Sequence, residues 1–148
     1  MSNFEKARRS KGWVVLLATV VGLGVGGYTY IHRAVSQQLY VTNCGIVDYK
    51  PDVLLKFCAD GGVGIGEVEW TQWTKDGAEG TGKYVANNCD PSCVDGKIFT
   101  KEVYVKLSKL KTISGKEAFT YVQVESKDKK PLPLLDSMDD EWSMEMAG

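Results

Sequence analysis

The sequence contains a single histidine, His32, which lies at the edge of a hydrophobic segment and not in the polar part of the chain. Histidine is the commonest general base and the commonest metal ligand in proteins. Its absence after residue 32 excludes a Ser-His-Asp or Cys-His catalytic arrangement in that part and argues against most hydrolase mechanisms. We expect no metal site and no cofactor.

An excess of positive charge is also missing. The chain of 148 residues has 18 lysines and arginines against 19 aspartates and glutamates, so its net charge is −1. Domains that bind DNA or RNA are typically strongly basic, because they neutralise phosphates. The composition therefore predicts no nucleic-acid partner.

There is only one long hydrophobic run, Gly12 to Ile31, and it contains no charged residue. A helix of about 20 apolar residues crosses the hydrocarbon layer of a membrane. Four basic residues lie within residues 1–11, whereas only Arg33 follows closely. By the positive-inside rule, residues 1–11 are a cytoplasmic basic segment, 12–31 a transmembrane anchor, and the rest of the chain is extracytoplasmic.

A cleaved signal peptide is the alternative, because it also combines a basic start with an apolar stretch. Ala34 is the obvious residue to precede the cleavage site, but His32 would then occupy the −3 position, where a small residue is required. This favours an uncleaved, single-pass cell-membrane protein. With cleavage, the protein would be secreted, and the same domain would still lie outside.

All four cysteines, Cys44, Cys58, Cys89 and Cys93, follow the hydrophobic segment. An even number of cysteines in an oxidising compartment predicts two disulfides. We favour Cys44–Cys58 with Cys89–Cys93, because each pair encloses a short loop; the other two connectivities stay open. A zinc site is disfavoured, since the spacings lack paired C-x-x-C motifs.

After residue 38 the sequence has short β-branched or aromatic segments separated by turn residues, which is typical of a β-sheet. Apolar and polar residues alternate over 66–73, 98–107 and 119–125, and shorter strands are expected over 53–58 and 84–86. The sequence predicts a mainly β domain, a small antiparallel sandwich or barrel of five to six strands.

This domain is expected to span residues 39–125. Residues 126–148 are rich in charge, with five acidic residues around Trp142, and are expected to form a flexible acidic tail. The alternative is a short acidic and aromatic peptide that docks elsewhere.

Several short motifs occur in a distinctive order in the middle of the chain. They are Tyr49-x-Pro51, Cys58-Ala59-Asp60-Gly61-Gly62, Trp70-Thr71-x-Trp73, Ala78-x-Gly80-Thr81-Gly82 and Asn88-Cys89-x-Pro91-Ser92-Cys93-x-x-Gly96. In this pattern the chain resembles small secreted or membrane-anchored actinobacterial proteins of unknown function. The resemblance implies an extracytoplasmic compartment and a β-rich fold, and no particular chemistry.

Two tryptophans are candidates for ligand binding, because aromatic rings pack against apolar faces of sugars and other rings. Trp70 and Trp73 are three apart, so on a regular strand they point to opposite faces. Trp70 shares the parity of Val68 and is expected in the core. Trp73 is then the exposed candidate binding residue, although packing alone also explains it.

Carboxylates are the remaining candidates. Glu67 and Glu69 lie on one face of an expected strand, about 7 Å apart, which suits the acid and base of a glycoside hydrolase. A solvated strand face explains them equally. Asp48 is a further carboxylate, and Asp60, before two glycines, is expected in a turn; calcium needs a denser set of oxygens.

The sequence thus favours an extracytoplasmic binding or envelope-associated module that is not an enzyme. Its expected partners are the membrane, through residues 12–31, and an envelope protein, a glycan or a second copy of the chain. The alternative is a small carboxylate-dependent hydrolase acting on cell-envelope glycans.

Overall fold

A computed structural model describes residues 23–28 and 38–145, which belong to two units, Met1–Gln38 and Leu39–Gly148. In the first unit residues 23–28 are helical. The basic segment 1–11 and the rest of the expected anchor 12–31 lie outside the described residues. Within the described ranges, no helix combines the length and the hydropathy needed to cross a membrane.

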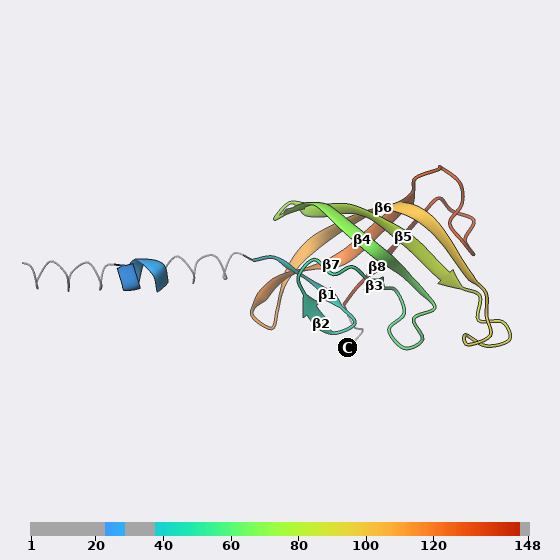
Figure 1. Cartoon of the computed structure of the whole chain (residues 1–148), viewed down its shortest axis with the longest axis horizontal. Coiled ribbons are helices and arrows are strands. Elements are labelled where there is room, and N and C mark those ends of the chain that lie inside the picture. Colours follow the sequence, from blue (N-terminus) through green and yellow to red (C-terminus); the bar gives the residue numbers. More distant parts are fainter. Residues whose placement is uncertain (1–22, 29–37, 146–148) are drawn as a thin grey trace, which may run out of the picture. The chain divides into compact units, whose positions relative to one another are not determined.

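The second unit is a single mixed sheet of eight strands (Figure 1). The strands are β1 (Tyr40–Asn43), β2 (Ile46–Asp48), β3 (Leu54–Leu55), β4 (Val63–Thr74), β5 (Gly77–Asn87), β6 (Ile98–Ile113), β7 (Lys116–Ser126) and β8 (Asp139–Ser143). Their order is β2-β1-β7-β6-β5-β4-β3, and β8 also pairs with β7. The mainly β prediction is confirmed. The predicted antiparallel sandwich or barrel of five to six strands is corrected: residues 38–145 form one sheet of eight strands that is not closed, and β1 runs parallel to β7. The additional strands are the short ones near the two ends of the domain, which carry little alternation of their own.

Alternation along the long strands forms the core. On β6, Val103, Val105 and Leu107 are buried, whereas the intervening side chains are exposed. Each such buried side chain stabilises the fold by about 1.5–3 kcal/mol. Lys101 has the buried parity, and its ammonium leaves the core to pair with Asp128 at 3.2 Å.

Strands β4 and β5 approach each other closely at Gly80, and glycine makes this approach possible. A Cβ at Gly80 would lie 2.4 Å from the carbonyl oxygen of Glu69, so only glycine allows this approach of the two backbones. The register of β4 against β5 also shifts between Gly66 and Glu69 and again between Trp70 and Gln72, as at β-bulges. Such irregularities bend a strand and increase its twist, and here they accompany the strong curvature of the sheet.

The prediction of a tail outside the domain is wrong for residues 126–145. Strand β8 pairs antiparallel with β7, and Leu132, Trp142 and Met144 are buried in the core. Asp140 and Trp142 share one face of β8, and Met144 continues the alternation after the strand ends, but the acidic composition of the segment obscures this pattern. The folded domain therefore extends from residue 39 to at least residue 145.

Both favoured disulfides are present: Cys44–Cys58, with Cα atoms 5.5 Å apart, and Cys89–Cys93, with Cα atoms 3.7 Å apart. No cysteine is free. The prediction of two disulfides is confirmed, and so is the favoured connectivity, in which each disulfide encloses a short loop. A zinc site made of four thiolates is excluded, because the sulfurs are bonded in two disulfide pairs.

Candidate functional site

Trp73 lies in an aromatic cluster, half-buried. Its ring centroid is 4.9 Å from that of Trp70, 5.6 Å from that of Phe119 and 6.0 Å from that of Tyr49. The expectation that Trp70 and Trp73 point to opposite faces is wrong. The irregularity between Trp70 and Gln72 breaks the regular alternation and brings both rings together.

Both indole N–H groups of this cluster are used within the fold. Trp73 Nε1 donates to the carbonyl oxygen of Leu39 at 3.0 Å, and Trp70 Nε1 donates to that of Pro51 at 2.8 Å. The two tryptophans thereby fasten the segment around β1 and β2 to β4. These contacts explain Trp73 as a packing residue, and a ligand contact of Trp73 stays a prediction.

The four carboxylates singled out in the sequence have separate local roles. Glu67 lies at the first β4 irregularity, with φ of 52°, and pairs with Lys83 at 2.6 Å; Glu69 lies opposite Thr81. Asp60 accepts a hydrogen bond from the backbone N–H of Gly62, as a turn residue does, and Asp48 accepts one from its neighbour's N–H. Glu67 and Glu69 are therefore not two members of one regular strand face.

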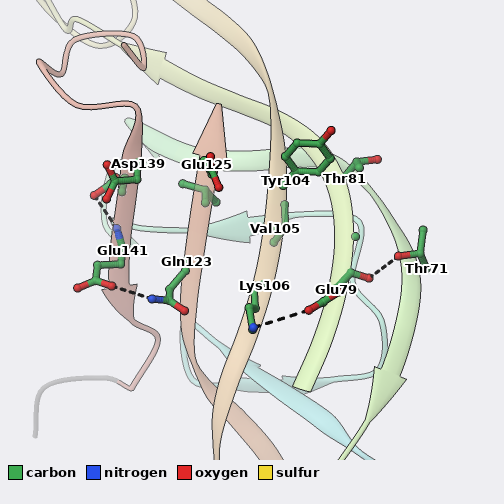
Figure 2. A pocket seen from close by; sticks show the side chains of 13 residues that line it. Thr71, Glu79, Thr81, Tyr104, Val105, Lys106, Gln123, Glu125, Asp139 and Glu141 are labelled. Carbon is green, nitrogen blue, oxygen red and sulfur yellow. Dashed lines mark hydrogen bonds and ion pairs between the residues drawn. The ribbon is translucent and has the colours of Figure 1, made fainter. Parts of the chain in front are cut away.

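A groove of about 590 Å³ lies on the face of the sheet opposite the core, which we call the outer groove (Figure 2). It extends across β4 to β8. Its lining residues are Thr71, Glu79, Gly80, Thr81, Tyr104, Val105, Lys106, Gln123, Val124, Glu125, Asp139, Asp140 and Glu141. Val105 and Val124 are buried on the core side, so the exposed side chains of the groove are almost all polar.

Strand register arranges these side chains in two rows. One row, across β5, β6, β7 and β8, contains Thr81, Tyr104, Glu125 and Asp139; the next contains Glu79, Lys106, Gln123 and Glu141. Facing residues of neighbouring strands are close enough for side-chain contact. Gln123 Nε2 donates to Glu141 Oε2 at 3.0 Å, and Lys106 pairs with Glu79 at 3.7 Å.

The groove is negatively charged, because five carboxylates and one lysine line it. Asp140 is neutralised on the core side by Lys56, and Glu125 pairs with Lys129. Asp139 and Glu141 accept hydrogen bonds from the neutral side chains of Ser137 and Gln123, and neither has a lysine partner among residues 38–145.

Two tyrosines lie in or beside the outer groove, near these carboxylates. Tyr104 stands in the groove with 52% of its surface exposed. Beside the groove on β7, partial desolvation and a hydrogen bond to Glu141 raise the pKa of Tyr121. The outer groove thus offers hydroxyl, amide, ammonium and carboxylate groups together with an exposed phenol ring.

Sequence reasoning missed this site. Its residues occupy the exposed parity of five strands, which looks like an ordinary solvated face until the register is known. In the part of the chain that the structure describes, no three histidine, cysteine, aspartate or glutamate side chains are placed to hold a metal ion. Comparison of the chain with protein-family models, curated proteins and solved structures finds no match.

Proposed function

We propose that this protein is a membrane-anchored extracytoplasmic binding module without catalytic activity, and that the outer groove holds its ligand. The observation that carries the proposal is the groove itself, a polar concavity of about 590 Å³ with one exposed aromatic ring. That volume is within the usual range of ligand sites, about 300–1,000 Å³.

The proposed compartment rests on the disulfides and on the sequence. Disulfides persist in oxidising compartments, and both cysteine pairs are bonded. The uncharged run at 12–31, with basic residues before it, favours an anchor and an outer domain. The resemblance to small secreted or membrane-anchored actinobacterial proteins favours the same compartment.

A hydrolase that uses Glu67 and Glu69 receives no support from their contacts. An acid and base pair needs two carboxyl groups facing one bond of the substrate. Glu67 is instead held in an ion pair with Lys83 and lies outside the outer groove. The binding function is therefore preferred.

The test is co-sedimentation of the full chain, in micelles of an uncharged detergent, with cell envelopes isolated from the source organism. We expect Tyr104→Ala to lower the bound fraction about tenfold. The matched control is Ile98→Ala, which removes an exposed apolar side chain from the same strand outside the groove and leaves binding unchanged. Equal binding by wild type and Tyr104→Ala would remove the groove from the proposal.

Compartment is tested separately by thiol labelling in intact cells. The proposal expects no labelling of the four cysteines without a reductant, and labelling by a membrane-impermeant reagent after reduction. Labelling without a reductant would place the domain in a reducing compartment and contradict the proposed topology.

A further inference from the structure

We infer that the ligand of the outer groove is a glycan without acidic groups, stacked on Tyr104 and hydrogen-bonded by the two rows of polar side chains. The inference rests on the proposed function and names the class of ligand for the same site. Three features of the groove carry it: the exposed ring, the mixture of donors and acceptors, and the sign of the charge.

The exposed ring is Tyr104, whose neighbours in the row are Thr81 on β5 and Glu125 on β7. Aromatic rings bury the apolar C–H face of a sugar, and the phenol O–H remains available for a hydrogen bond. Lys127 Nζ lies 5.7 Å from the ring centroid. More than half of the Tyr104 surface is nevertheless open to solvent, so the ring is available for stacking.

A second ring extends the surface along the strands. Tyr121 faces Ser108, which is four residues beyond Tyr104 on β6, so the two tyrosines lie about 13 Å apart along the sheet. Lys109 Nζ is 3.4 Å from the centroid of Tyr121 and covers one side of this ring. A ligand that touches both tyrosines must be elongated, as an oligosaccharide is.

The side chains between the rings match hydroxyl groups. A sugar hydroxyl both donates and accepts, and the groove offers acceptors on Glu141 and Asp139, donors on Lys106, and both kinds on Gln123. Carboxylates and amides bind paired hydroxyls with two hydrogen bonds at once. The Gln123–Glu141 hydrogen bond fixes these two groups before a ligand arrives.

The charge of the groove excludes acidic ligands. Asp139 and Glu141, without lysine partners among residues 38–145, would repel a carboxylate, sulfate or phosphate group. A basic peptide would satisfy the charge. Lys106 in the middle of the groove would repel such a peptide, and a lysine side chain offers Tyr104 no flat C–H face to stack on, so the groove favours a chain of sugars over a basic peptide.

The experiment uses the full chain in micelles of a sugar-free, uncharged detergent, since a maltoside would compete. It is applied to an array of neutral, amino-bearing and acidic oligosaccharides, and to octalysine as the peptide probe. We expect binding to neutral or amino-bearing oligosaccharides only, weakened about tenfold by Tyr104→Ala and unchanged by Ile98→Ala. Stronger binding of the amino-bearing oligosaccharides would indicate that Asp139 and Glu141 bind an ammonium group of the ligand.

Three outcomes overturn the inference. Binding of acidic oligosaccharides would show that the ligand is an acidic glycan, and binding of octalysine alone would show that it is a basic peptide. If no oligosaccharide binds while envelope sedimentation still depends on Tyr104, the glycan is wrong and the binding function stands. If both the array and the sedimentation are insensitive to Tyr104→Ala, the proposed function fails with it.

Discussion

The ammonium of Lys56 lies 2.6 Å from the carboxylate of Asp140, although 84 residues separate the two in sequence. Tyr84 donates its hydroxyl to the same carboxylate at 2.9 Å. Lys56 directly follows β3, Tyr84 is on β5 and Asp140 is on β8, so this group of polar side chains joins three strands that do not pair with each other. The group connects the two sides of a sheet that is not closed by backbone hydrogen bonds.

We expect Asp140→Ala to lower the free energy of unfolding by about 2–4 kcal/mol, because it leaves Lys56 and Tyr84 without their acceptor in a largely buried place. Urea unfolding at neutral pH measures the loss. The matched control is Glu145→Ala, which breaks an exposed pair with Lys111 and should cost less than about 1 kcal/mol. Equal losses for the two variants would show that the contacts of Asp140 stabilise the fold no more than an exposed ion pair does.

Trp142 tests whether the C-terminal segment belongs to the folded domain. This side chain is 7% exposed, and we expect Trp142→Ala to cost about 3–5 kcal/mol through the cavity it leaves. Its Nε1 is buried and has no acceptor among the described residues. Trp142→Phe removes this N–H and should therefore cost less, about 1 kcal/mol. Thermal unfolding of the two variants checks the order; an unchanged melting temperature for Trp142→Ala would place β8 outside the domain.

Gly80→Ala tests the close approach of β4 and β5. The new Cβ would meet the Glu69 carbonyl oxygen at 2.4 Å, so the backbone must shift, and we expect a loss of about 2–3 kcal/mol. Gly66→Ala is the control, because a Cβ there meets nothing within 4 Å. It should stabilise slightly, by about 0.5 kcal/mol, through the entropy of the unfolded chain. A Gly80→Ala variant as stable as Gly66→Ala would contradict the tight approach.

The pH dependence of stability follows from Tyr84. Burial and the hydrogen bond to Asp140 raise the pKa of Tyr84 above its ordinary value of 10.0. The protonated phenol is thus favoured in the folded state, and its contribution is complete below pH 10 and is lost as the pH rises further. We expect the free energy of unfolding to fall more steeply in wild type than in Tyr84→Phe as the pH rises above about 10. Lys83 and Lys129 are present in both proteins, so their raised pKa values cancel in the comparison.

Trp73→Ala separates packing from ligand binding. The variant loses three ring contacts and the hydrogen bond to Leu39, so we expect a loss of about 3 kcal/mol in urea unfolding. Envelope binding per folded molecule should stay at the wild-type level, because Trp73 lies outside the outer groove. A stable Trp73→Ala variant that no longer binds would make Trp73 the ligand platform predicted from the sequence.

The strands that could be predicted are those whose own residues alternate. Alternation over 98–107 and 119–125 found β6 and β7. The turn residues expected between segments include Asp76-Gly77 and Ser114-Gly115, which lie where the β4–β5 and β6–β7 hairpins reverse. Strand β5 was recognised only over 84–86, because Gly77, Gly80 and Gly82 give no β signal of their own. Those glycines are required by the neighbouring strand, which is a tertiary constraint.

The candidate site depended on register even more strongly. Simple parity placed Trp73 on the face of the sheet opposite to Trp70. The irregularity between Trp70 and Gln72 in β4 places both rings in one cluster instead. The outer groove requires five strands to be aligned, so no local pattern indicates it. Tyr104, for example, is one aromatic residue among lysines and glutamates on the exposed parity of β6 until Thr81 and Glu125 are placed on either side.

Strand β7 has one edge paired with β6, and β1 and β8 both pair with its other edge. Strand β1 precedes the other strands of the sheet, yet its partner residues Ala118 and Phe119 on β7 are made only after β2 to β6, and β8 follows them. The Cys44–Cys58 loop and the β4–β5 hairpin need only nearby sequence and can form while the chain is still growing. The order of assembly is therefore imposed by topology: the strands from β3 to β6 can organise first, and β1 and β8 can be added only after β7 has been made.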